Sequence, residues 1–136
     1  GMKGKVKWLL ADGVDLGASP LAGKWWDVVL DVSTFHCFGN MDRAAYCEGL
    51  KGLVRPGGHL LLVAMSDKGS SHVAGPRRVS QNEIYKSFPA SSGWEVESIE
   101  DTLLEHHPNI NRTGGRNGWP AWRGYAEAHL AVIRRL

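Results

Sequence analysis

The sequence has little cysteine, little net charge and no long apolar run. Its two cysteines, Cys37 and Cys47, lie ten residues apart without CxxC spacing, so neither a disulfide framework nor a metal site of the zinc-knuckle type is indicated. No apolar stretch reaches the ~18 residues of a membrane span, and no signal peptide opens the chain. The formal charge of +2 is too small to indicate a nucleic-acid partner. These shortages favour a reduced, cytoplasmic location with no membrane partner.

The length of 136 residues and the hydrophobic content of 43% are those of an ordinary globular protein with one core. The sequence contains neither an internal repeat nor a domain boundary. Gly1 resembles the remnant of a cleaved tag ahead of Met2. The sequence therefore predicts a single domain over residues 2–136.

Hydrophobic periodicity and helix-capping signals predict five strands and two helices. The expected strands are residues 5–11, Trp26–Val32, 59–65, 94–104 and Tyr125–Arg135. The first helix is expected to open with Asn40 as its N-cap and to end at Arg55-Pro56-Gly57-Gly58; the second follows the capping box of Ser80 and Glu83. The strand at Trp26–Val32 is nearly continuously apolar, which indicates burial on both faces of a parallel sheet. Residues 106–123 read as a long surface loop. This order predicts an α/β fold whose sheet is mostly parallel and ends in an antiparallel strand pair.

Several motifs in this order have a familiar arrangement. They are the run WDVVLD at 26–31, Phe35-His36 after it, the turn and strand LVRPGGHL at 53–60, Leu10-Ala11-Asp12 before Gly13, and the closing strand at 128–135. The set resembles class I S-adenosylmethionine-dependent methyltransferases and is most similar to their thiopurine-methyltransferase-like, small-molecule branch. The resemblance implies a Rossmann-like sheet and transfer of a methyl group from S-adenosylmethionine to a small nucleophile.

The same resemblance assigns cofactor-binding residues. Asp12, followed by Gly13, takes the position of an aspartate that accepts from the adenine amino group, and Asp31, Val32 and Ser33 take the position of the segment that passes the methionine portion. Other roles are open for the two aspartates: Asp12 can cap its own turn, and Asp31 can be a buried carboxylate bonded to backbone amides.

Three further residues are candidates for acting on the methyl acceptor. His36 is the candidate general base, because an imidazole with an ordinary pKa near 6.5 accepts a proton at neutral pH. Phe35 is expected to line an apolar substrate pocket, and Arg77 to contact a substrate anion through its guanidinium. The alternatives are a hydrogen-bonded loop histidine at position 36 and a solvated surface charge at position 77.

The sequence also lacks a feature that the resemblance calls for. No G-x-G-x-x-G-like loop follows a strand, so the chain resembles the C-terminal half of a methyltransferase domain, truncated so that it lacks the N-terminal segment with the glycine-rich turn. The strand Trp26–Val32 would then form a bare sheet edge, which invites pairing with another strand. Either residues 5–11 move in to pair with it, or two chains join along it, so a homodimer or an intertwined assembly is expected. The alternative to an enzyme is a non-catalytic remnant that serves as an assembly or ligand-binding module.

Overall fold

Four strands form one mixed sheet in the computed structural model, which describes residues 4–69, 76–105 and 125–136. The strands are β1 (Trp26–Val32), β2 (Val54–Met65), β3 (Trp94–Glu105) and β4 (Tyr125–Arg135), in the spatial order β1-β2-β4-β3. β1 pairs parallel with β2, whereas β4 lies between β2 and β3 and pairs antiparallel with both. Three strands therefore run in one direction and β4 in the other. This confirms the predicted α/β fold and its antiparallel C-terminal pair, in a mixed sheet whose parallel pair is β1 with β2.

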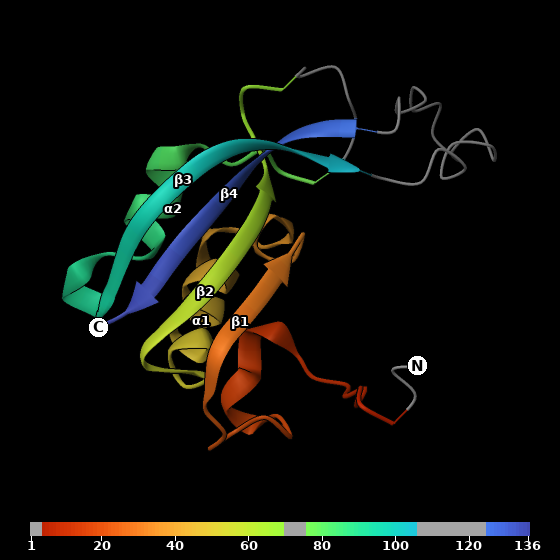
Figure 1. Ribbon diagram of the computed structural model, residues 1–136, viewed down its shortest axis with the longest axis vertical. Coiled ribbons are helices and arrows are strands. Elements are labelled where there is room, and N and C mark those ends of the chain that lie inside the picture. Colours follow the sequence, from red (N-terminus) through yellow and green to blue (C-terminus); the bar gives the residue numbers. More distant parts are fainter. Residues whose placement is uncertain (1–3, 70–75, 106–124) are drawn as a thin grey trace.

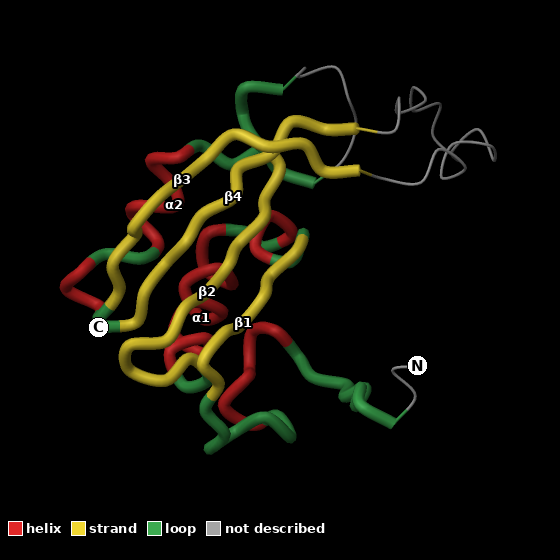
Figure 2. The backbone as a smooth tube through the Cα atoms, viewed as in Figure 1, coloured by secondary structure: helices red, strands yellow, loops and turns green. Residues whose placement is uncertain are grey.

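Both α-helices cover the same face of the sheet (Figure 1). They are α1 (Asn40–Lys51) and α2 (Gln81–Ser87), and three short 3₁₀ turns, η1 (Gly13–Ala18), η2 (Phe35–Cys37) and η3 (Ala90–Ser92), flank them (Figure 2). The hydrophobic core lies between these helices and the sheet. It contains fully or almost fully buried side chains from every layer, among them Leu50, Leu60, Leu62, Ile84, Phe88, Trp94 and Ile133.

The opposite face of the sheet is covered by no helix in the part of the chain that the structure describes. On β1, Val28, Leu30 and Val32 point to that face and are 54%, 65% and 48% exposed, whereas Asp31 points to the helices and is 2% exposed. The prediction that this strand is buried on both faces is therefore wrong. The side that carries Val28, Leu30 and Val32 is the more apolar one, but the helices of the described residues cover only the other side, which carries Val29 and Asp31. β1 also has β2 as its only strand neighbour among the described residues, so it forms the bare edge that the sequence leads one to expect.

Residues 6–11 form no strand, which corrects a second prediction. The segment leads away from the sheet, and Trp8 and Leu10 are 90% and 94% exposed (Figure 1). Alternating side chains supply the pattern of a strand, but a strand also needs a neighbour whose backbone groups pair with its own. No such neighbour lies beside this segment in the described residues.

Local signals placed some element ends correctly, but the predicted end of the first helix at Arg55-Pro56-Gly57-Gly58 is wrong. α1 ends at Lys51, and residues 55–58 belong to β2, which begins at Val54 because that residue already pairs with Trp26 of β1. Ser80 and Glu83 form the predicted capping box at the start of α2, and Gly57 adopts the positive φ expected of its turn, 78°. The N-cap of α1 is Gly39 rather than Asn40, which is the first helical residue. The predicted loop at 106–123 lies outside the described residues. Among the helices that are described, none has the length and apolarity to cross a membrane.

Candidate functional site

The chain leaves β1 through a turn that Asp31 holds in place. Its carboxylate is almost fully buried and accepts hydrogen bonds from the backbone N–H groups of Thr34 (2.8 Å) and Phe35 (3.1 Å) and from the hydroxyl of Tyr46 (3.0 Å). Burial raises the pKa of Asp31, and the bonds from Thr34 and Tyr46 oppose this shift. Asp31 thus has the structural role of a carboxylate satisfied by amides, and it fixes the loop at the carboxyl end of the strand.

Ser33 is held in a strained backbone conformation inside this turn. Its φ of 71° is the positive φ of a non-glycine residue, a conformation that costs of order 1–3 kcal/mol and persists only where surrounding contacts impose it. The contacts are the Ser33 N–H bond to the carbonyl of Val63 (3.0 Å) on one side and the Asp31 bonds on the other. Such strain is concentrated at ligand-binding and catalytic loops.

A second loop meets this turn through aromatic side chains. A Cβ placed on Gly13 would lie 2.8 Å from the tip of the Phe38 ring, so a larger residue would require that ring to shift. The Phe38 ring packs on Tyr46 at 4.8 Å between centroids, and Tyr46 bonds to Asp31. Asp12 itself caps η1, accepting from the Val14 N–H at 3.0 Å, and remains exposed to solvent. The two segments assigned to the cofactor therefore converge at one edge of the sheet, except that the Val32 side chain points to the opposite face.

His36 does not have the geometry of a general base. It is 2% exposed, and its Nδ1 accepts a hydrogen bond of 2.9 Å from the backbone N–H of Met65, so the neutral ring carries its proton on Nε2 and has no free lone pair. Burial lowers the pKa of His36, as do the nearby positive charges of Arg78 and Arg43. The structure gives His36 the hydrogen-bonded loop role instead: it ties η2 to the end of β2.

The lowered pKa of His36 predicts a loss of stability in mild acid. In the unfolded chain this histidine takes up a proton below its ordinary pKa of 6.5, while the folded chain resists protonation. The free energy of unfolding therefore falls with pH, by at most about 1.4 kcal/mol per unit. Urea unfolding between pH 7 and pH 5 measures this. His36→Gln, which keeps an acceptor for Met65, is expected to flatten the dependence. A slope in this variant equal to that of the unchanged chain would refute the assignment.

Phe35 belongs to the core rather than to a substrate pocket, which corrects a further prediction. Its side chain is fully buried, and its ring lies 5.8 Å from that of Phe88 and 4.3 Å from the guanidinium carbon of Arg43. Phe35 was singled out by its position beside His36 after the strand, and that position carries no information on which way the ring points.

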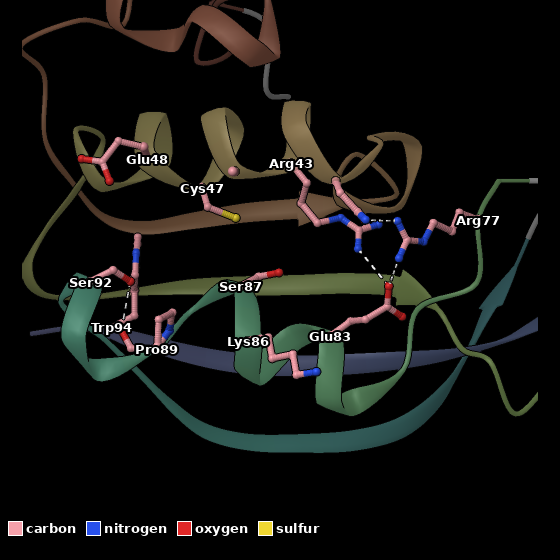
Figure 3. Close-up of a pocket in the computed structure, with 12 residues that line it drawn as sticks. Arg43, Cys47, Glu48, Arg77, Glu83, Lys86, Ser87, Pro89, Ser92 and Trp94 are labelled. Carbon is pink, nitrogen blue, oxygen red and sulfur yellow. Dashed lines mark hydrogen bonds and ion pairs between the residues drawn. The ribbon is translucent and has the colours of Figure 1, made fainter.

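Arg77 lies apart from the turn, in a groove between α1 and α2 (Figure 3). Its guanidinium donates to Asn40 and pairs with Glu83, to which Arg43 also donates at 3.3 Å. The groove has a volume of about 510 Å³, and Trp94 and Pro89 lie at its other end. Arg77 is therefore an ion-paired side chain of a separate hollow, and no cluster of three or more metal-ligating side chains forms in the parts of the chain that the structure describes.

The sequence analysis did not single out Arg43, Tyr46 or Phe38, which organise this region. Arg43, Tyr46 and Leu50 recur at helical spacing on the buried side of α1, so an arginine and a tyrosine stand where apolar residues are usual. These two polar residues on the apolar side of the predicted helix were the signal from which their buried roles could have been predicted.

Solved structures define the class to which this fold belongs. One described for the conversion of a disulfide bond into a thioacetal group during echinomycin biosynthesis matches with a TM-score of 0.66 at 22% identity, over 92% of this chain and 53% of the other. An S-adenosylmethionine-dependent methyltransferase from Anabaena variabilis matches with a TM-score of 0.63 at 14% identity, over 99% and 62%. The fold is that of the S-adenosylmethionine-dependent methyltransferases.

Sequence comparison then narrows the class to a family. The family profile described as thiopurine S-methyltransferase matches residues 3–120, and the chain belongs to that family. The thiopurine S-methyltransferases of Vibrio vulnificus and Vibrio parahaemolyticus are 33% and 32% identical over 90 and 89 residues. These matches cover 65% of this chain and 40% of each relative, so the matched region is well under half of the relatives' length. The resemblance stated from the motifs is thereby confirmed.

Proposed function

We propose that this chain takes part in methyl transfer from S-adenosylmethionine to a small-molecule nucleophile and supplies one side of the cofactor site. The observation that carries the proposal is the convergence of Asp12 and Gly13 with the Asp31 turn at the carboxyl edge of β1. Ligands of open α/β sheets bind at this edge. When bound, the cofactor's sulfonium supplies the reactive methyl group.

The residues present fit the adenine end of the cofactor better than its methionine end. In the proposed arrangement the exposed carboxylate of Asp12 accepts from the adenine amino group, and the backbone at Val32 and Ser33 passes beside the methionine portion. Asp31 contacts no ligand; it positions the turn. His36 holds η2 against β2, so no side chain of the turn removes a proton from the acceptor in this proposal.

Cofactor binding is tested by calorimetric titration with S-adenosylhomocysteine on protein of known oligomeric state. Micromolar affinity, about −8 kcal/mol, is expected, and Asp12→Asn should weaken it roughly tenfold by removing a charged acceptor. Asp15→Asn is the matched control, because Asp15 also caps a turn of η1 but precedes no predicted adenine contact. Equal loss in both variants would point to damage of η1 instead.

The second candidate is a non-catalytic module that uses the methyltransferase fold for assembly. The engaged ring of His36, whose Nδ1 accepts from the Met65 N–H, favours it. Absence of any heat with S-adenosylhomocysteine, from folded protein, would select this candidate. A cytoplasmic location stays a prediction under either.

We further propose that a second copy of the chain lies along β1. Along its outer edge the strand has no neighbouring strand among the described residues, and it has three exposed apolar side chains, Val28, Leu30 and Val32. The same chain carries a segment outside any helix or strand, residues 6–10, whose Trp8 and Leu10 are exposed and which pairs with no strand in the described part of the chain. Each copy thus offers both an edge and a strand-like segment to its partner. Joining along β1 would place the partner beside the carboxyl edge where the cofactor turn lies.

A further inference from the structure

Three polar side chains meet at the part of the sheet where β2, β4 and β3 lie side by side (Figure 1). Ser66 directly follows β2, His129 lies on β4, and Asp101 on β3 is its partner in the strand register. The Oγ of Ser66 lies 3.0 Å from Nε2 of His129, and Nδ1 of the same ring lies 3.2 Å from Oδ1 of Asp101. A hydroxyl, an imidazole and a carboxylate therefore follow one another in the order of a catalytic triad.

The neighbours of this cluster set the direction of its hydrogen bonds. The backbone N–H of Lys68 donates to the Oγ of Ser66 at 3.0 Å, so the hydroxyl keeps its own proton for Nε2 of His129. Nε2 is then the acceptor, and the ring proton lies on Nδ1, on the side of Asp101. Nδ1 has no aligned hydrogen bond among the described residues, and catalytic hydrogen bonds often align only when substrate binds. In this tautomer the imidazole can remove the serine proton.

Two carboxylates lie close enough to stabilise the imidazolium that such a proton transfer forms. The hydrogen bond from Lys68, 2.6 Å long, lowers the pKa of Asp101, and the neighbouring His129 lowers it further, so Asp101 is ionised. The Oδ1 of Asp67 lies 3.7 Å from Nε2 of His129. His129 is fully buried, and a buried ring takes up a proton only where opposite charge lies close to it. Asp67 and Asp101 supply that charge.

A small hollow leads to the serine. Its volume is about 240 Å³, and Ser66, Lys68, Thr102 and Leu103 are among the residues that line it. Ser66 is only 1% exposed, so a reactant must enter the hollow to reach its Oγ. Sites for drug-sized molecules have about 300–1,000 Å³, and this hollow therefore suits a short acyl group. Lys68 brings an ammonium to the wall of the hollow and a backbone N–H to Oγ, and positive groups of this kind stabilise an oxyanion.

We propose that Ser66, His129 and Asp101 hydrolyse small esters of short carboxylic acids. The Oγ of Ser66 bonds to the ester carbonyl carbon while Nε2 of His129 takes the hydroxyl proton. The bond from that carbon to the alcohol oxygen then breaks, and the alcohol leaves with the proton from Nε2. Water next adds to the acyl carbon and gives a proton to Nε2, and the acid leaves as Oγ takes the proton back. Asp101 contacts no reactant and is a positioning residue.

This activity goes beyond the proposed methyl transfer and does not depend on it. It uses the ends of β2, β4 and β3 rather than the turn that follows β1, and it needs no S-adenosylmethionine. A chain that binds no S-adenosylhomocysteine can therefore still hydrolyse an ester, and the two proposals fail separately.

The test treats the full chain at neutral pH with p-nitrophenyl acetate and, separately, with a small fluorophosphonate that carries methyl substituents. The chain is expected to release p-nitrophenol faster than the ester hydrolyses in buffer. The fluorophosphonate is expected to lose fluoride and to bond through phosphorus to the Oγ of Ser66, a position that mass spectrometry of the digested chain identifies. Release no faster than in buffer, or attachment at Lys68 or elsewhere in place of Ser66, would overturn the proposal.

Variants of the cluster give a second readout. Ser66→Ala is expected to lose both ester hydrolysis and labelling. Asp101→Asn should slow both at least about tenfold, and Asp101→Glu, which keeps the carboxylate, should retain more of the rate. Glu100→Gln is the matched control, because Glu100 is the exposed neighbour of Asp101 on β3 and points to the other face of the sheet; its rate should be unchanged. Full hydrolysis by Ser66→Ala, or equal losses in Asp101→Asn and Glu100→Gln with the fold intact by circular dichroism, would contradict the proposal.

Discussion

Replacing Leu30 by lysine is expected to convert a self-associated chain into a monomer. Leu30 is 65% exposed at the centre of β1, so a lysine there has ample space in a single copy. In the proposed assembly the same position is covered by the partner, and a buried, unpaired ammonium costs several kcal/mol. The dissociation constant of the dimer, measured by sedimentation equilibrium, should rise at least about a hundredfold.

The opposite edge of the same sheet provides the control. Leu103 on β3 is 61% exposed on an edge strand, so Leu103→Lys makes the same chemical change at equal exposure but away from β1. It should leave the dimer intact. A wild-type chain that sediments as a monomer at all concentrations would refute the proposed dimer. Equal effects of the two lysines would mean that added positive charge, and not its position on β1, separates the copies.

Replacing Asp31 by alanine is expected to have the largest effect on folding of any single change at the site. The substitution leaves two backbone N–H groups and the Tyr46 hydroxyl without their acceptor. Each buried donor left unsatisfied costs about 1–3 kcal/mol, so the free energy of unfolding should fall by roughly 3–5 kcal/mol. Urea unfolding measures the loss, and S-adenosylhomocysteine binding should be lost with it because the Ser33 turn is released.

Two comparisons separate this effect from a general loss of charge. Asp27→Ala removes an exposed carboxylate from the same strand, which pairs with Arg55 at 2.5 Å, and should cost no more than about 1 kcal/mol. Tyr46→Phe removes one of the three donors and should cost about 1–2 kcal/mol. If Asp31→Ala were no more destabilising than Asp27→Ala, the proposed organising role of Asp31 would be wrong.

The elements that depend on local signals could be predicted from the sequence. The capping box at Ser80 starts α2, and the apolar run of β1 and the strand patterns of β3 and β4 are formed where expected. Gly57 has the expected positive φ, but it lies within β2 rather than at the end of α1. The segment at 5–11 failed because alternation specifies side chains and not a pairing partner. A strand that pairs with this segment would have to come from another part of the protein or from a second chain.

The roles of individual site residues were harder to predict because their partners are distant in sequence. His36 accepts a hydrogen bond from Met65, 29 positions away, and Asp31 accepts one from Tyr46 on α1, 15 positions away. Nothing in the local sequence distinguishes a histidine whose acceptor nitrogen is occupied from one that is free. The roles of the two aspartates were easier to predict, because both roles involve backbone groups a few positions away. Asp12 caps its own turn and Asp31 accepts from backbone amides, as the alternatives in the sequence analysis stated.

The position of β4 has a consequence for how the sheet is assembled during synthesis. β4 is the last of the four strands in chain order, yet it separates β2 from β3. While a nascent chain has emerged only as far as β3, that strand has no neighbour in the sheet, and the inner edge of β2 stays open. Both are sites where unfinished chains aggregate. Shielding by the ribosome or a chaperone until β4 emerges should therefore raise the yield of folded protein, and the β1–β2 pair with α1 is the part able to form first.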